Sequence, residues 1–321
     1  MCMDFANQVL DTNDVKLVDS QGAGWSFTVI SHTKDKVVQF KRNALDKRML
    51  ALAKTIYMTL TPTVTRCGVD FPLPVYIIDK ALGVDFSTLI PPPMDQPFPL
   101  DRYHRGVIDL ARFIARSICF PQAANEAGPW TKSASRHLDT LINDKDFSKL
   151  APELVRIAKR TKPYLHLLDT LPLVLSHADL SALNVFVSGL SGVIDWEHAS
   201  VEAFGMTLCS VYEMFLSQRV GNKIIFHGEL VSEYRTVKEV LEEAFWNELW
   251  ACVSDVLDPG VSGPAVRTAM IVGAFTRFMP LENLEHMRNT EEADPDNVEV
   301  LVRPRGFITA LPPIVLPESG P

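Results

Sequence analysis

The sequence has few cysteines, and they are not arranged as a cross-linked framework or a metal site would require. There are five in 321 residues, separated by long intervals and without a CxxC pair. A disulfide framework typically has an even number of cysteines, and a cysteine zinc site typically contains closely spaced cysteine pairs. We therefore expect reduced thiols in a reducing compartment and a cytoplasmic protein.

Long apolar runs and an excess of basic residues are also missing. Residues 1–10 do not combine a basic stretch with an apolar run, so they do not resemble a signal peptide. The most apolar segments are interrupted by charges, as Arg267 and Arg277 interrupt residues 265–279, so no membrane-spanning helix is expected. The formal net charge of −8 argues against a nucleic-acid partner. The same negative charge is compatible with a cationic substrate.

Glycine is scarce relative to proline, with 16 glycines against 22 prolines. Prolines gather at residues 72–74 and 91–99, where they break regular structure. Five more lie in the last 21 residues, which cannot form one continuous helix and which we expect to be an extended tail. The 47% hydrophobic content excludes disorder of the bulk, and the length predicts two domains or lobes.

Hydrophobic periodicity predicts strands first and helices afterwards. The expected strands cover residues 15–20, 25–32, 36–41 and 75–78, with a helix over 45–60 between them. The later helices are expected over 101–117, 152–168, 206–218, 230–257 and 265–278. Residues 173–195 read as apolar strands around a polar loop. The sequence thus predicts an α+β protein with a β-rich lobe over 1–82 and a helical lobe over 83–321, and we expect a ligand in the cleft between them.

The polar loop contains the residues that suggest chemistry. It reads H-x-D-x4-N from His177 through Asp179 to Asn184, and Asp195 follows 11 residues later. Phosphoryl transfer needs one carboxylate that orients or deprotonates the attacking hydroxyl, and oxygen ligands that hold Mg²⁺ against the triphosphate. Asp179 fits the first role. Asn184 and Asp195 fit the second, because a strand–loop–strand spacing can bring them to one metal.

These motifs resemble those of the aminoglycoside phosphotransferase and choline kinase group, which shares the protein-kinase fold. In that group the catalytic loop reads H-G-D-x4-N and the metal motif reads I-D-W or I-D-F. Here His177 begins H-A-D-x4-N and Ile194 begins I-D-W, within the longer run G-V-I-D-W-E-H-A. Residues 37–41 resemble the third strand of the fungal-type members, and residues 74–83 resemble the strand and hinge that hold the adenine.

The resemblance implies a bilobal protein-kinase-like fold and ATP-dependent transfer of the γ-phosphoryl group to a hydroxyl of a small molecule, such as a secondary metabolite or an antibiotic. It implies Asp179 as the catalytic base, and ATP and Mg²⁺ as cofactors. The implied Mg²⁺ ligands are Asn184 and Asp195. The implied nucleotide-binding residues are Gly22 and Gly24 in the loop over the phosphates, Lys41 at the α- and β-phosphates, and the backbone from Asp79 to Ala81 at adenine.

The helix over 45–60 departs from the family pattern, because it lacks the glutamate that usually pairs with the phosphate-binding lysine. Its single acid, Asp46, could be that partner or an ordinary acid at a helix start. Strand alternation puts Gln39 and Lys41 on one face, so Lys41 rather than Arg42 is expected to point inward. Trp-Glu stands after Asp195 where protein kinases have Phe-Gly, which favours a small acceptor over a protein.

Two other functions stay open. A non-catalytic binding protein would explain the missing helix glutamate, and nucleotidyl transfer could use the same cleft. Trp196 is expected in the core. Trp246 and Trp250, at helical spacing, are expected to be core or lobe-packing residues, or they could line an acceptor pocket. Glu197 and His198 could begin a helix or contact the acceptor, and Glu202, Glu213 and Asp255 could bind an amine or lie on a solvated face.

Overall fold

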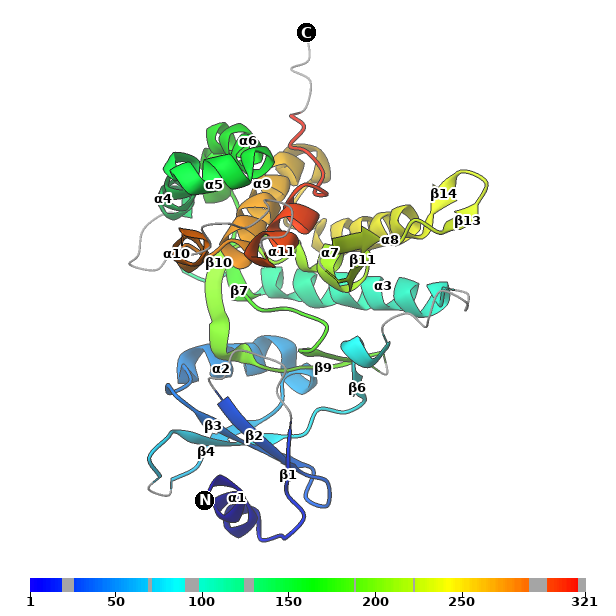
Figure 1. The fold of residues 1–321 in the computed structure, drawn as a ribbon. Coiled ribbons are helices and arrows are strands. Elements are labelled where there is room, and N and C mark those ends of the chain that lie inside the picture. Colours follow the sequence, from blue (N-terminus) through cyan, green and yellow to red (C-terminus); the bar gives the residue numbers. More distant parts are fainter. Residues whose placement is uncertain are drawn as a thin grey trace. The chain divides into compact units, whose positions relative to one another are not determined.

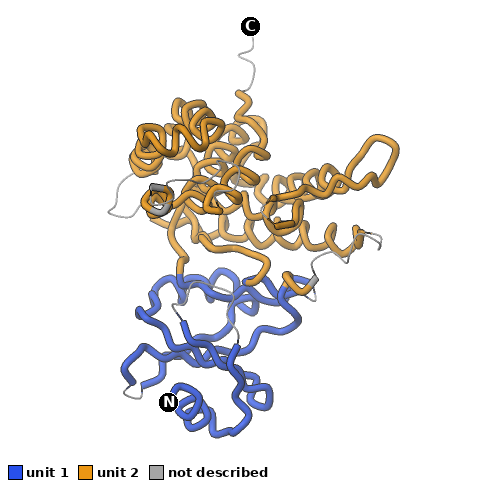
Figure 2. Tube along the Cα trace, in the orientation of Figure 1, with its two compact units in different colours: residues 1–85, 184–197 blue, residues 86–183, 198–321 orange. Residues whose placement is uncertain are grey.

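The computed structural model describes residues 1–18, 26–68, 71–89, 98–123, 130–187, 189–221, 223–288 and 299–316 of the chain. The chain forms two compact units (Figure 2). Unit 1 contains residues 1–85 and 184–197, and unit 2 contains residues 86–183 and 198–321. The segment that includes Asn184 and Asp195 therefore belongs to the N-terminal unit, although it is distant from the rest of that unit in sequence.

Unit 1 is built on a five-stranded antiparallel sheet with the order β1-β2-β3-β5-β4 (Figure 1). The strands are β1 (Lys16–Leu17), β2 (Ser26–Ser31), β3 (Lys36–Lys41), β4 (Val64–Arg66) and β5 (Val75–Asp79). β-Branched and aromatic residues on the inner face form the core, as such residues favour pleated surfaces. The buried members of this core are Ala6, Leu10, Val15, Val29, Val38, Phe40 and Val75.

Helix α1 (Cys2–Leu10) is absent from the elements that the sequence predicts. Its buried residues have helical spacing, because Ala6 and Leu10 are four positions apart and both lie in the same core as the sheet strands. A nine-residue helix is marginal by itself in water. Its packing against the sheet therefore accounts for its presence.

A smaller sheet in unit 1 has the order β6-β8-β9, from β6 (Val84–Asp85), β8 (Val185–Val187) and β9 (Leu190–Val193). Helix α2 (Lys47–Tyr57) and the 3-10 turn η1 (Met58–Leu60) precede β4, and η5 (Trp196–His198) follows β9. Gly192 permits the close approach of β9 to the chain before β6. A Cβ at this position would lie 3.2 Å from the Cβ of Ala81.

Unit 2 is mainly helical. Its helices are α3 (Leu100–Arg116), α4 (Trp130–Asn143), α5 (Lys145–Leu150), α6 (Pro152–Thr161), α7 (Ser210–Met214), α8 (Val237–Val253), α9 (Pro259–Phe278), α10 (Glu282–Arg288) and α11 (Glu299–Ile308), with the 3-10 segments η2 (Phe86–Leu89), η3 (Ser117–Cys119) and η4 (Lys162–Thr170). Helix α9 is buried on nearly all sides and packs against η4, α4, α6 and α11, whereas α3 and α8 lie side by side (Figure 1). A helix that is apolar all round is typical of a protein interior.

Three antiparallel pairs complete unit 2: β7 (Leu173–His177) with β10 (Ala199–Ala203), β11 (Ser217–Val220) with β12 (Lys223–Phe226), and β13 (Leu230–Ser232) with β14 (Arg235–Thr236). The last two correct the predicted helices over 206–218 and 230–257. The second helix begins only at Val237, because Thr236 and Glu239 form a capping box at its start. That motif marks a helix N-terminus.

Two further predictions on unit 2 need correction. Helix α9 begins at Pro259 rather than at 265, because the Asp258 side chain accepts hydrogen bonds from the backbone N–H groups of Gly260 and Val261. The expected extended tail begins with helix α11, which contains Pro304. Residues 317–321 lie outside the described residues, and so do the prolines of 91–97.

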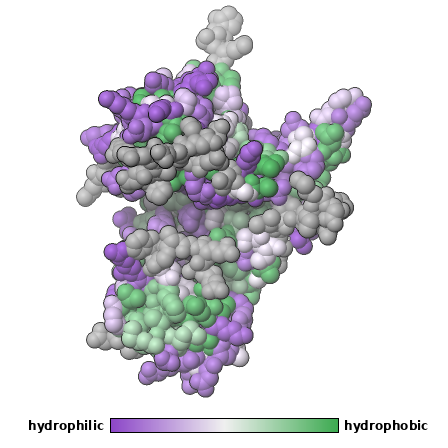
Figure 3. All heavy atoms as spheres, viewed as in Figure 1, coloured by the Kyte–Doolittle hydropathy of each residue, from purple (hydrophilic) through white to green (hydrophobic). Residues whose placement is uncertain are grey.

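The surface differs between the units. Figure 3 shows polar side chains gathered over the α4–α6 region of unit 2, and an apolar area over the sheet of unit 1. Leu17 in β1 is among the exposed large apolar residues of unit 1. Within the parts of the chain that the structure describes, none of the helices has both the length and the apolar character of a membrane span.

Candidate active site

The β8–β9 hairpin brings together the two residues that the sequence suggests as metal ligands. Asn184 immediately precedes β8 and Asp195 closely follows β9. The pairing of Val185 with Val193, and a 2.9 Å hydrogen bond from the Ile194 N–H to the Asn184 carbonyl, place both at the same end of the hairpin. Antiparallel pairing joins residues distant along the chain, so the local strand pattern accounts for this proximity.

Asp195 has an uncommon backbone conformation, with φ of 60°. Few residues other than glycine adopt this left-handed region, although aspartate tolerates it better than most. The next residue, Trp196, is buried as expected, with its ring centroid 5.1 Å from that of Tyr57 and its Nε1–H donating to the Val193 carbonyl. This packing holds the turn. Conformations of this kind often occur at functional sites.

Lys41 lies beside Asp195 within unit 1. It ends β3, its side chain is only 3% exposed, and its Nζ is 2.6 Å from Glu197 Oε2 and 3.3 Å from Asp195 Oδ1. Arg42 is exposed. A buried charge must be paired, and here one ammonium serves two carboxylates. Of the two neighbouring basic residues, Lys41 is therefore the buried one and Arg42 the exposed one.

Glu197 is the partner that the sequence did not reveal. Asp46 is not used for this purpose, because it is the N-cap of α2 and accepts hydrogen bonds from the backbone N–H groups of Arg48 and Met49. Such caps satisfy the unpaired N–H groups at a helix start. No acid occurs in residues 47–57. That absence was the signal that the lysine must find its counter-ion elsewhere.

The predicted adenine-binding segment lies at the end of β5. The Asp79 N–H donates to the Thr63 carbonyl and the Lys80 N–H to the Asp35 carbonyl, both at 3.0 Å. The hydrogen bond from Lys36 lowers the pKa of the Asp79 carboxyl. Because these two N–H groups already donate hydrogen bonds within the protein, an adenine ring would have to bind to a carbonyl of this segment or to the backbone of Ala81. Gly22 and Gly24 lie outside the described residues.

Asp179 belongs to unit 2 and follows strand β7. β7 pairs with β10 through residues such as His177 and Ala199, and the Leu180 N–H donates to the His177 carbonyl at 3.2 Å, which closes a tight turn. His177 is buried, as a structural role requires. The Asp179 side chain is 50% exposed, so the turn presents the carboxylate to solvent.

Arg277 approaches Asp179 because helix α9 packs tightly on the chain around Met206. A Cβ at Gly273 would lie only 1.8 Å from the Met206 carbonyl oxygen, so only glycine permits this approach. Arg277 is one helical turn further and therefore on the same side of α9. The packing of Gly273 thus brings its guanidinium to the start of α7.

The Arg277 guanidinium joins three groups of unit 2. It is 10% exposed, and its Nη2 is 2.7 Å from Glu213 Oε2 and 3.6 Å from Asp179 Oδ1, while Nη1 donates to Ser210 Oγ at 3.0 Å. Burial lowers the pKa of Arg277, but an arginine remains charged in proteins. The contacts hold the Asp179 carboxylate beside a fixed cation.

A second arginine completes the group. Arg303 from α11 pairs with Glu213 Oε1, so both oxygens of Glu213 are used by arginines. Both guanidiniums also lie over the Phe278 ring, at 5.3 Å for Arg277 and 5.8 Å for Arg303. We call Asp179, Glu213, Arg277 and Arg303 the arginine cluster. No sequence motif marks its last three members, and the sequence left Glu213 as either an amine ligand or part of a solvated face.

Burial disfavours the charged form of two neighbouring groups. Burial raises the pKa of the Glu202 carboxyl, whose Oε1 accepts a 2.7 Å hydrogen bond from Ser200 Oγ. It also raises the pKa of the Cys209 thiol to about 11. A thiol with such a pKa is protonated at neutral pH and is a poor nucleophile. Covalent catalysis by Cys209 is therefore not indicated.

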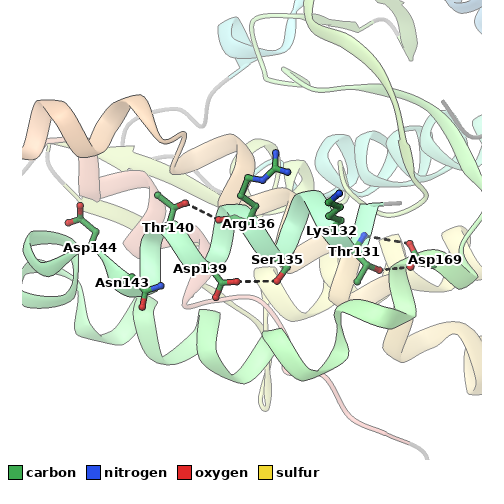
Figure 4. Close-up of a pocket in the computed structure, with 9 residues that line it drawn as sticks. All are labelled: Thr131, Lys132, Ser135, Arg136, Asp139, Thr140, Asn143, Asp144 and Asp169. Carbon is green, nitrogen blue, oxygen red and sulfur yellow. Dashed lines mark hydrogen bonds between the residues drawn. The ribbon is translucent and has the colours of Figure 1, made fainter. Parts of the chain in front are cut away.

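Two surface hollows of unit 2 contain none of the predicted site residues. One, of about 870 Å³, follows the outer face of α4 and is lined by hydrogen-bonded polar side chains such as Thr131 with Asp169 and Ser135 with Asp139 (Figure 4). The other, of about 660 Å³, is lined by the stacked rings of Trp246 and Trp250. These two tryptophans are partly exposed, so they are not core residues, which was one of the alternatives for them.

The residues at the end of the β8–β9 hairpin fit Mg²⁺. They supply an amide oxygen and a carboxylate, and Mg²⁺ is typically held by one or two carboxylates together with substrate phosphates. Lys41 between Asp195 and Glu197 leaves one formal negative charge, which favours a cation. Among the described residues, no group of three or more His, Cys, Asp or Glu side chains is arranged to hold a metal. A metal held entirely by such side chains is therefore not indicated there.

Comparison with known structures establishes the fold. Aminoglycoside phosphotransferase APH(4)-Ia superposes with a TM-score of 0.58 at 14% identity, covering 96% of this chain and 97% of that one. An ethanolamine kinase of Plasmodium vivax superposes with a TM-score of 0.52 at 11% identity, covering 96% and 86%. The predicted α+β, protein-kinase-like fold is confirmed.

Comparison at the level of sequence gives the family. No curated protein sequence matches the chain. The family model described as the phosphotransferase enzyme family matches residues 22–221, which is more than half of the chain and includes Lys41, Asp179, Asn184 and Asp195. This protein is therefore a member of the phosphotransferase enzyme family.

Proposed function

We propose that the protein is an ATP-dependent kinase that transfers the γ-phosphoryl group to a hydroxyl of a small molecule in the cytoplasm. The observation that carries the proposal is the arrangement in unit 1. There Lys41 pairs with Asp195, and Asn184 lies at the same end of the β8–β9 hairpin. Family membership supports phosphoryl transfer in general.

On this proposal unit 1 binds the nucleotide. Asn184 and Asp195 would hold Mg²⁺, which when bound neutralises phosphate charge and orients the γ-phosphoryl group. Lys41 Nζ is a point charge suited to phosphate oxygens. Glu197 keeps that ammonium in place, because its Oε2 lies 2.6 Å from Nζ and the lysine has little exposure to water. The charge is therefore available without a large reorganisation.

Asp179 would orient the acceptor hydroxyl and accept its proton. Its carboxylate is half exposed and lies 3.6 Å from the Arg277 guanidinium, which fixes its direction. Only five positions separate it from Asn184 in the chain. Most of the rate gain would come from positioning and charge stabilisation, since phosphoryl transfer has a loose transition state that needs little help from a base.

The residues after Asp195 support a small acceptor. Trp196 is buried and Glu197 is paired with Lys41, so both side chains make contacts within unit 1 and are not free to bind a protein substrate. The pairing of Glu197 also removes the main argument for a non-catalytic protein. That argument rested on a lysine without a glutamate partner.

The test is a screen of hydroxylated metabolites for ATP consumption, with Asp179→Asn as the blank and Arg136→Gln as a surface control. We expect turnover by the wild type and by the control, and a fall of about 10²–10⁴-fold in Asp179→Asn without a change in Tm. The product should gain one phosphoryl group by mass spectrometry. Normal turnover of Asp179→Asn would disprove the role of Asp179, and a product carrying an adenylyl group would show nucleotidyl transfer instead.

A further inference from the structure

The arginine cluster presents two side chains of opposite charge to solvent. The exposed fraction is 50% for Asp179 and 51% for Arg303, whereas Arg277 is 10% and Glu213 is 12% exposed. The two exposed members are joined through the two buried ones. An acceptor that reaches Asp179 would therefore meet Arg303 as the other accessible charge of this cluster.

The buried members cannot take part in recognition of an amine. Glu213 receives Arg277 on Oε2 and Arg303 on Oε1, so both of its oxygens are already bound. The two carboxylates of the cluster are balanced by two guanidiniums. An ammonium group would gain little at a neutral cluster whose more exposed cation would repel it.

Arg303 has the chemistry and the support of an anion site. A guanidinium has five N–H donors in a planar fork that matches carboxylate and phosphate oxygens, and the pair with Glu213 uses only part of it. The Phe278 ring lies under both guanidiniums and itself packs on Phe307, with a centroid distance of 4.9 Å. The guanidinium is thus held in place before any ligand binds.

We propose that the acceptor is a hydroxylated anion, in which a carboxylate or phosphate group binds to Arg303 while a neighbouring hydroxyl faces Asp179. This inference rests on the proposed function, because it assumes that Asp179 marks the acceptor side. It differs from the cationic acceptor with which the net charge of the whole chain is compatible. The local cluster rather than the overall charge determines which ligand is attracted at short range.

The first experiment measures anion binding without nucleotide. Thermal unfolding is followed while malonate, inorganic phosphate or tetramethylammonium chloride is titrated at constant ionic strength with sodium chloride. We expect saturable stabilisation by malonate or phosphate, and an apparent Kd weaker by roughly tenfold or more in Arg303→Gln. The control is Arg136→Gln, which changes an exposed arginine on α4. It should bind the anions as the wild type does.

Three results of this experiment would overturn the proposal. The first is that neither anion stabilises the protein in a saturable way. The second is that Arg303→Gln binds the anions as well as the wild type does. The third is that tetramethylammonium stabilises the protein instead. Equal binding would mean that the anion binds to another positively charged side chain, such as Lys41. Because Arg303 is half exposed, Arg303→Gln should fold, and its Tm without ligand is the check.

The second experiment separates the two possible sources of the anionic group. The same variants are titrated with ATP and Mg²⁺. Unchanged ATP stabilisation of Arg303→Gln assigns Arg303 to the acceptor, whereas loss of that stabilisation assigns it to the nucleotide phosphates and refutes the proposal. Asp179→Asn should lose transfer but keep malonate binding. A failed metabolite screen with intact anion binding would count against the proposed function and not against the anion site.

Discussion

The two units contain ion clusters of the same design but of different net charge. In unit 1 the buried Lys41 lies between Asp195 and Glu197, at 3.3 and 2.6 Å. In unit 2 the buried Arg277 lies between Asp179 and Glu213, at 3.6 and 2.7 Å. In each cluster a fixed cation holds one proposed functional carboxylate, and a second carboxylate holds the cation.

The difference is the second arginine of unit 2. Lys41 faces two carboxylates, so its cluster has one formal negative charge and suits a divalent cation. Arg303 adds a positive charge beside Glu213, so the other cluster is neutral and exposes a guanidinium. On the two proposals, one local arrangement serves a metal in unit 1 and an anion in unit 2, and a single additional charge makes the difference.

The largest effect is expected from Lys41→Met. It leaves Asp195 and Glu197 without their shared cation, and breaking a buried pair in this way is costly. Because both acids are partly exposed, we expect a loss of about 2 kcal/mol in the free energy of unfolding, below the usual range for buried pairs. Phosphoryl transfer should fall by about 10²-fold or more. Urea unfolding and kcat measure the two effects.

The double variant Lys41→Met/Glu197→Gln is the matched control. It removes the stranded Glu197 carboxylate, so it should recover part of the stability but none of the activity. A Lys41→Met protein as stable as the wild type would show that the lysine is not needed to pair these acids, and that the two clusters do not share a design.

A smaller effect is expected from Arg277→Lys. Lysine keeps the charge but cannot reach Ser210, Glu213 and Asp179 together, because it lacks the planar fork. We expect kcat to fall by about tenfold with little change in KM, since Asp179 loses its orientation rather than its charge. Steady-state kinetics with the acceptor from the screen test this.

Arg277→Met provides the contrast for that variant. It should lose more stability than Arg277→Lys, because Glu213 then keeps only Arg303 as a partner. A large rise in KM with an unchanged kcat in Arg277→Lys would instead place Arg277 in acceptor binding, and the parallel with Lys41 would be lost.

The smallest effect is expected from Glu202→Gln. Burial raises the pKa of Glu202 in the folded state. Its protonation therefore contributes to the free energy of unfolding, and this contribution is complete below the unfolded-state pKa of about 4.3. The contribution is lost as the pH rises through the folded-state pKa. Glutamine has no such dependence. We expect its Tm to exceed that of the wild type by about 2 °C at pH 8.

The sign of that difference is tested by a pH series of thermal unfolding. The advantage of Glu202→Gln should shrink as the pH is lowered and disappear near pH 4. Glutamine keeps an oxygen that can accept from Ser200 Oγ. A constant difference across the series would mean that the substitution acts through packing and not through the proton.

Much of the arrangement in unit 1 could be predicted from sequence. The spacing of Asn184 and Asp195 across two short apolar runs predicts a hairpin, and alternation along β3 predicts that Lys41 points inward. In unit 2 the sequence also contains the capping box of Thr236 and Glu239 that starts α8, although hydrophobic periodicity alone placed that start at residue 230. These features depend on residues close together in the chain, where backbone geometry limits the arrangements.

The sequence by itself therefore determined the family, the order of strands and helices around the polar loop, and the proposed roles of Asp179, Asn184 and Asp195. Only the tertiary structure decided which charges meet. Glu197 pairs with Lys41 across 156 positions, and Arg303 pairs with Glu213 across 90. Such pairs leave no spacing pattern, because they depend on how distant segments pack, as α9 does at Gly273. The charge offered to the acceptor follows from that packing.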